Sequence, residues 1–310
     1  MTENLLDNNL NTPLIPSRAI DRYSFIAQLF IWLGIFLGCF LLAQMISSLI
    51  ILSYYKSADI KQIVSNPADL NILRYVQMLA TLFSFLLPAL IFSRLKSDSL
   101  LQYAKAAVGF NPVFLLLIPL LLITFYPLIN VSFFVNKYMF WNDWFKDYQG
   151  DYKIIVEGLL KDQSVYVFVL NFITVAVLPA ICEEWIFRGT LQKLLTERLN
   201  IHIAVFLAAL FFSLIHFEFS GFLPRVILGM FLGYLFYYSG SLWTSIFAHL
   251  VNNGAQVVFI YLNNKGIYKM DVENPEMPQV WELIVYSLAF AGLWSLFYHF
   301  AQKRKNSTFV

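Results

Sequence analysis

The chain has 310 residues, of which 59% are hydrophobic and only 13% are charged. That is about half the charged fraction of a soluble domain. The net charge of +2 indicates neither nucleic-acid binding nor an acidic partner. With only two cysteines, the chain has no disulfide framework and no cysteine-rich metal site. The composition predicts a polytopic helical membrane protein.

Several uncharged runs reach the ~20 residues that a helix needs to cross ~30 Å of hydrocarbon. We therefore predict an all-α fold, a polytopic transmembrane helical bundle of about eight spans. The predicted spans are 25–53, 74–94, 112–136, 165–195, 201–219, 222–238, 241–262 and 280–300. As one helix, the uncharged stretch 226–264 would be ~58 Å long, so we expect it to turn back at Ser239-Gly240-Ser241.

The chain divides into four parts. Residues 1–23 are expected to form a flexible cytoplasmic tail, and residues 24–164 the first helices with a polar connection. Residues 165–262 form a membrane core that contains the polar motifs, and residues 263–310 the last helix with a basic tail. The basic tail favours the cytoplasm, and an even number of spans returns the N-terminus to the same side.

Two adjacent glutamates, Glu183 and Glu184, end an uncharged stretch that is long enough to cross the membrane. Ionisable residues inside a membrane are costly and point to function. The fourth and fifth spans should form a hairpin that turns near Leu199, 16 residues after Glu183 and 17 residues before His216. At equal rise per residue the two side chains reach the same depth. Glu183 could then act as a general base on a shared water, with His216 assisting.

Two further residues of this region are expected to support the site. Glu184 and Arg188 have the i, i+4 spacing of a helical ion pair, which leaves Glu183 as the freer carboxylate. Phe212 lies one turn before His216, where packing is the simplest role, although it could also orient the imidazole.

His249 and Asn253 also have i, i+4 spacing, so they share one face of the seventh span. An imidazole and a carboxamide offer two donors that could hold the oxyanion of a tetrahedral intermediate. The imidazole and the carboxamide could instead be metal ligands. A divalent metal such as zinc, if present, would be bound by Glu183, His216 and His249. A simpler alternative is that each polar side chain only forms hydrogen bonds between helices.

Three short motifs follow one another within residues 165–262. They are Glu183-Glu184-x-x-x-Arg188, Phe212-x-x-x-His216 and His249-x-x-x-Asn253. In this order and on hydrophobic helices, they resemble the CPBP family of CAAX proteases and bacteriocin-processing enzymes, also called the type II CAAX prenyl endopeptidase or Abi family.

The resemblance implies an intramembrane endopeptidase. Glu183 and His216 would activate water, and His249 and Asn253 would form the oxyanion hole. Members of the family are often labelled metalloproteases, and a metal-independent glutamate mechanism is also argued. The chain lacks the His-Glu-x-x-His zinc signature, so a zinc cofactor stays open.

The expected substrate is a membrane-associated or lipidated peptide or protein. Its cleavage would be either CAAX-type processing or bacteriocin maturation and immunity. The expected location is a bacterial inner (cell) membrane, with both termini cytoplasmic.

Two other functions use the same residues. A transporter or proton relay could move ions through Glu183, His216 and His249, but no inverted repeat is evident. A non-catalytic immunity or scaffold protein could keep the fold after losing catalysis, although the intact motifs argue against this.

Overall fold

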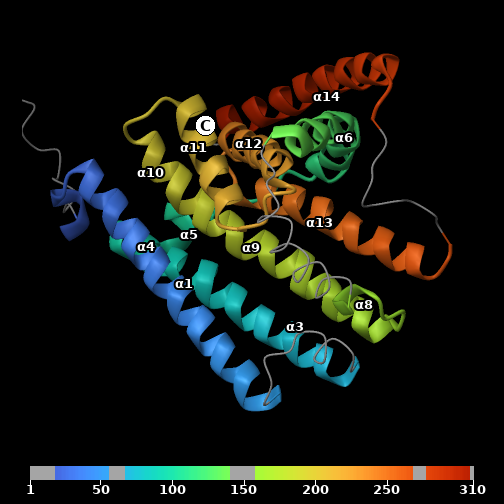
Figure 1. Ribbon diagram of the computed structural model, residues 1–310. Coiled ribbons are helices and arrows are strands. Elements are labelled where there is room, and N and C mark those ends of the chain that lie inside the picture. Colours follow the sequence, from blue (N-terminus) through green and yellow to red (C-terminus); the bar gives the residue numbers. More distant parts are fainter. Residues whose placement is uncertain (1–17, 56–66, 140–157, 268–276, 308–310) are drawn as a thin grey trace, which may run out of the picture.

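The computed structural model describes residues 18–55, 67–139, 158–267 and 277–307. Within these ranges all regular secondary structure is helical (Figure 1), which confirms the predicted all-α fold. Most of the predicted tail 1–23 and most of the polar connection before residue 164 lie outside the described residues.

Seven helices of the described ranges are long and apolar enough to cross a membrane. They are Phe25–Tyr55, Leu70–Lys96, Phe114–Tyr138, Val165–Thr196, Phe222–Ser239, Leu242–Asn264 and Val280–Lys303. The remaining predicted span, 201–219, is the apolar helix α11 (Ile201–Leu214). Its 14 residues rise only about 21 Å, less than the ~30 Å of hydrocarbon. The predicted span is therefore too long at its C-terminal end.

Two of the long helices are interrupted by π-helical turns. The second span joins α3 (Pro67–Thr81), η2 (Leu82–Leu86) and α4 (Leu87–Lys96). The fourth joins α8 (Val165–Asn171), η3 (Phe172–Val177), α9 (Leu178–Glu184), η4 (Trp185–Gln192) and α10 (Lys193–Thr196).

The first two π-helical turns each precede a proline. Pro88 follows η2 and Pro179 follows η3. A proline has no N–H for the carbonyl four residues earlier, and its ring clashes with that carbonyl in a regular α-helix. A wider π-turn relieves the clash without ending the helix. The third segment, η4, follows the two glutamates directly, with no proline of its own.

The other helices complete the bundle. They are η1 (Ala19–Arg22), α1 (Phe25–Tyr55), α5 (Leu100–Tyr103), α6 (Phe114–Met139), α12 (Phe222–Ser239), α13 (Leu242–Asn264) and α14 (Val280–Ser307). Gly240, which ends α12, has a φ of 67°. Glycine adopts this left-handed conformation at little cost, so the predicted turn between α12 and α13 is confirmed.

Helices α11 and α12 approach each other closely through two glycines of α12. A Cβ added at Gly229 would lie 3.0 Å from the Cβ of Ala209, and one at Gly233 would lie 3.0 Å from a Val205 methyl group. Small residues allow such close contact between membrane helices. The contact also places the backbone of α12 beside the fourth span.

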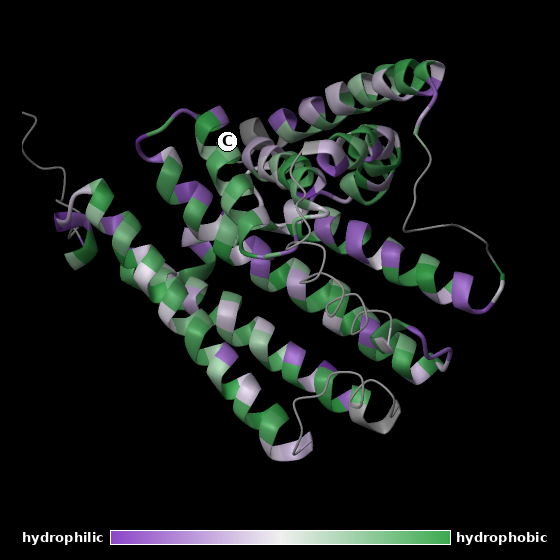
Figure 2. Cartoon of the chain, in the orientation of Figure 1, coloured by the Kyte–Doolittle hydropathy of each residue, from purple (hydrophilic) through white to green (hydrophobic). Residues whose placement is uncertain are grey.

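Buried apolar residues form two clusters. The first includes Trp32, Phe92, Phe187 and Phe212, from α1, α4, η4 and α11. The second joins α6, α12, α13 and α14. Large apolar side chains also cover the outside, as on α1, where Phe30 is 69% exposed. Figure 2 shows hydrophobic residues along most of the length of the long helices, and such exposed apolar side chains suit contact with lipid.

Candidate functional site

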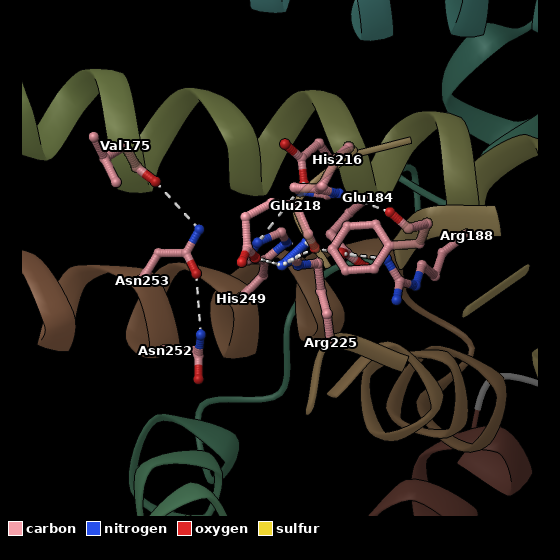
Figure 3. Close-up of polar contacts among 11 residues, drawn as sticks. Val175, Glu184, Arg188, His216, Glu218, Arg225, His249, Asn252 and Asn253 are labelled. Atoms are coloured by element: carbon pink, nitrogen blue, oxygen red, sulfur yellow. Dashed lines mark hydrogen bonds and ion pairs between the residues drawn. The ribbon is translucent and has the colours of Figure 1, made fainter. Parts of the chain in front are cut away.

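The two glutamates are buried where the fourth span meets the turn after α11 and the middle of α13. They are the last two residues of α9, and only 7% of Glu183 and 0% of Glu184 is exposed. Figure 3 shows the polar side chains that gather around Glu184. The sequence motifs, far apart along the chain, therefore meet in one place.

Glu183 faces two imidazoles. Its Oε2 atom lies 4.0 Å from Nε2 of His216 and 3.9 Å from Nε2 of His249. Both distances are too long for a direct hydrogen bond. They are suitable for one water molecule that bridges the three groups. The matched depth that the sequence predicted for Glu183 and His216 is therefore confirmed.

His216 lies in the turn that follows α11, not inside a helix as the predicted span 201–219 implied. Its Nδ1 atom is 2.7 Å from the carbonyl oxygen of Phe212. A carbonyl can only accept, so Nδ1 carries a proton and Nε2 of the neutral ring presents a lone pair toward Glu183. Phe212 thus orients the imidazole through its backbone, and its ring packs 5.0 Å from that of His216.

The turn after His216 is closed by an ion pair that the sequence analysis missed. Phe217 has a φ of 50°, which reverses the chain. Glu218 pairs with Arg225 of α12 and accepts a hydrogen bond from the backbone N–H of Gly221 at 3.1 Å. The spacing of Glu218 and Arg225 on either side of a glycine is the only sequence signal for this pair.

A buried asparagine of α6 fixes the same turn. Asn136 donates from Nδ2 to the carbonyls of Phe219 and Ser220, at 3.0 and 2.7 Å. Its Oδ1 atom accepts from the backbone N–H of Leu223 at 2.9 Å. Only 3% of Asn136 is exposed. We conclude that this residue, also missed by the sequence analysis, positions the turn that contains His216.

Glu184 joins two partners through one oxygen. Its Oε1 atom accepts from Arg188 at 2.7 Å, which confirms the predicted ion pair. The same atom is 2.9 Å from Nδ1 of His249. The contact with His249 was not predicted, because the residues are 65 positions apart in the sequence.

Arg188 has further contacts on the opposite side of the pair. It donates to the carbonyl of Gly229 at 2.8 Å, and its guanidinium lies 4.9 Å from the centre of the Phe212 ring. Only 1% of Arg188 is exposed. The ion pair, the carbonyl and the aromatic ring together compensate for burying its charge.

Asn253 lies one turn beyond His249 and contacts η3, as Figure 3 shows. Its Nδ2 atom donates to the carbonyl of Val175 at 3.2 Å, and its Oδ1 atom accepts from Asn252 at 3.0 Å. Pro179, four residues after Val175, has no N–H to offer that carbonyl. The structure thus brings Glu183, Glu184, His216 and His249 together and places Asn253 beside them, in contact with the backbone of η3.

The side chains of the site are farther apart than the ligands of a zinc site. Zinc ligands in a tetrahedral site lie about 3.3 Å from one another, and the oxygen of Glu183 is 3.9 and 4.0 Å from the two imidazole nitrogens. No group of three or more His, Cys, Asp or Glu side chains in the described ranges is arranged to hold a metal ion.

Residues 165–255 match the family model described as Type II CAAX prenyl endopeptidase Rce1-like. The matched segment contains all three motifs, so the resemblance to the CPBP family of CAAX proteases is confirmed. No curated protein and no solved structure matches the chain.

Proposed function

We propose that this protein is an intramembrane endopeptidase that hydrolyses a peptide bond of a membrane-associated or lipidated substrate. The Rce1-like domain supports this activity at the level of the family. The observation that carries the proposal is the placement of both Nε2 atoms, of His216 and His249, about one water molecule away from Glu183.

The proton acceptors at this site match the two protons of a water molecule. One proton can be donated to the carboxylate of Glu183 and the other to the lone pair on Nε2 of His216. When Glu183 takes its proton, the hydroxide attacks the carbonyl carbon of the scissile bond. The C–N bond then breaks, and Glu183 returns the proton to the leaving amine.

The oxyanion that forms in this step needs donors. His249 can supply one from Nε2 when both ring nitrogens are protonated, with Glu184 accepting from Nδ1. Asn253 uses one of its two amide hydrogens on Val175, so the other can be donated to the oxyanion. The supporting residues Arg188 and Phe212 then hold Glu184 and His216 in place.

The proposed mechanism assigns each step to side chains of this protein and needs no metal. A bound zinc ion stays an untested prediction from the sequence. Metal analysis of the purified, active protein tests it directly. Activity that persists in a metal-free sample supports the glutamate mechanism, and activity that requires added zinc contradicts it.

The experiment that tests the proposed function compares wild type with Glu183→Gln in membrane vesicles. An S-farnesylated Cys-a-a-X peptide serves as the probe for CAAX-type processing, and the new termini of membrane proteins report on other substrates. We expect hydrolysis to fall by at least about a thousandfold, since a general base alone supplies 10²–10⁴-fold and Glu183 also returns the proton.

Glu197→Gln is the matched control, because Glu197 follows the C-terminal end of the same span and pairs with Lys96, away from the site. It should leave hydrolysis unchanged. If neither the probe nor any membrane protein is cleaved in a manner that depends on Glu183, the proposal is wrong. Proteoliposome ion flux that requires Glu183 would then favour a transporter, and full function of Glu183→Gln in cells would favour a scaffold.

A further inference from the structure

Three carboxamides follow His249 along one face of α13. Asn252, Asn253 and Gln256 lie three, four and seven residues after it, so all four side chains share that face. Figure 3 shows the two asparagines beside the site, and Figure 2 shows hydrophilic residues recurring toward the C-terminal end of α13. We call Asn252, Asn253 and Gln256 the carboxamide stripe.

The stripe keeps much of its hydrogen-bonding capacity unused. Among the residues that the structure describes, Asn252 donates to Asn253, and Gln256 makes one long contact of 3.4 Å with the carbonyl of Asn252. Each of these amides has two donor hydrogens and an acceptor oxygen. Gln256 is exposed, and both asparagines are half-buried.

Such a face cannot be turned toward lipid. It lies within a membrane span, and an unpaired carboxamide in hydrocarbon costs several kcal/mol, on the order of 2–7. The groups that satisfy the stripe must therefore be polar. A carboxamide has the same donor and acceptor arrangement as a peptide group, and the stripe has no charged member that would select a charged partner.

We propose that the carboxamide stripe binds the backbone of the substrate as an extended segment beside the scissile bond. This inference rests on the proposed function. From His249 to Gln256 the helix rises about 10.5 Å, which is the length of about three extended residues. The stripe therefore binds the main chain of a short stretch of the substrate. It places no requirement on the side chains of that stretch.

The stripe also gives the substrate a direction. It leads from His249 away from Ser241, toward the end of α13 at Asn264. In the predicted topology this is the end of the bundle away from the chain termini. The segment bound by the stripe thus extends from the site toward that end.

The first measurement asks whether water reaches the stripe, independently of any activity. A cysteine at Gln256 is labelled with a membrane-impermeant maleimide, with wild type as the control for the native cysteines. Leu288→Cys is the matched lipid-facing control, because Leu288 is 70% exposed within the span of α14. Labelling needs a thiolate, which forms where water is present, so Gln256→Cys should react at least about tenfold faster.

The second measurement uses the same S-farnesylated Cys-a-a-X peptide as the probe. Saturating peptide should slow the labelling of Gln256→Cys several-fold in a Glu183→Gln background, in which the peptide is not consumed. In the active protein, Gln256→Leu should raise the KM for the peptide by about three- to tenfold with a much smaller change in kcat, as expected for one or two lost hydrogen bonds. A merely structural role would lower stability and kcat instead.

The outcomes separate the two proposals. If Gln256→Cys is labelled as slowly as Leu288→Cys, the stripe proposal is wrong. The stripe proposal is also wrong if the peptide does not slow the labelling of Gln256→Cys although the active protein hydrolyses that peptide. Protection by the peptide without any Glu183-dependent hydrolysis keeps the stripe as a peptide-binding site and overturns the proposed function.

Discussion

At the scale of single residues, the central contact of the site is the Oε1 atom of Glu184, which accepts from both Arg188 and His249. The other oxygen of Glu184, Oε2, has no hydrogen-bond partner among the described residues. The loss of either partner should therefore destabilise the buried carboxylate more than the loss of one partner in a fully paired network. A carboxylate that is completely buried needs a nearby cation, and Arg188 is permanently charged.

We expect Arg188→Ala to destabilise the protein strongly. The change leaves the carboxylate of Glu184 buried without its cation, and breaking such a pair costs about 3–5 kcal/mol. Thermal unfolding in detergent checks this, with Arg198→Ala as the control because Arg198 is exposed in the turn before α11. A melting temperature equal to that of the control would show that Arg188 does not stabilise Glu184.

At the scale of helices, the site depends on the close contact of α11 and α12. Gly229 supplies both the space for Ala209 and the carbonyl that binds Arg188. The distance between the two helices and the position of the guanidinium are therefore coupled. A change in helix packing at Gly229 should be transmitted to Glu184 and then to His249.

We expect Gly229→Ala to destabilise the protein by about 1–3 kcal/mol, the usual cost of overpacking. The new methyl group would meet backbone and side chain of Ala209 at 3.2 and 3.0 Å, and the rod-like helices have little room to shift. Gly292→Ala is the matched control in a membrane helix, because a Cβ there meets nothing within 4 Å. Equal melting temperatures for the two variants would contradict the coupling.

The elements also show what sequence could and could not predict. Counting residues from Leu199 placed Glu183 and His216 at one depth, because helices rise by a constant amount. Counting could not reveal that α11 ends at Leu214, since Ile215 and Phe217 are apolar and the local sequence does not signal the left-handed φ of Phe217.

The contacts of Asn253 were equally hidden. They depend on a carbonyl of Val175 that Pro179 leaves without its usual donor, and on the way α13 packs against η3. Spacing along α13 placed Asn253 on the face of His249. It could not show which neighbouring helix that face meets.

At the scale of the whole molecule, the two apolar clusters meet on α13. The residues of η4 belong to the cluster with α1 and α4, and α13 contributes Leu242 and Ile246 to that cluster and Ala248 to the cluster with α6 and α14. Glu184 and His249 thus lie on helices that share the first cluster. Their relative position is fixed by many apolar side chains, so the polar contacts need not do so alone.

The topology predicts that both termini are on the cytoplasmic side. A reporter that is active only in the cytoplasm should be active when fused to the C-terminus and inactive when inserted at Gly266, in the turn after α13. A periplasmic reporter at the same two positions serves as the control and should give the opposite pattern. Activity of the cytoplasmic reporter at Gly266 would contradict the orientation that the placement of Lys and Arg predicts.

The turn after His216 has a consequence for natural variation. Asn136 binds it through two carbonyls and one N–H of the main chain. These main-chain groups are present whatever side chains stand at Phe219, Ser220 and Leu223. The one exception is a proline at position 223, which would remove the N–H. At these three positions the turn can therefore accept other side chains without losing its contacts with Asn136, and the constraint passes to Asn136, on a helix outside the segment that matches the family model.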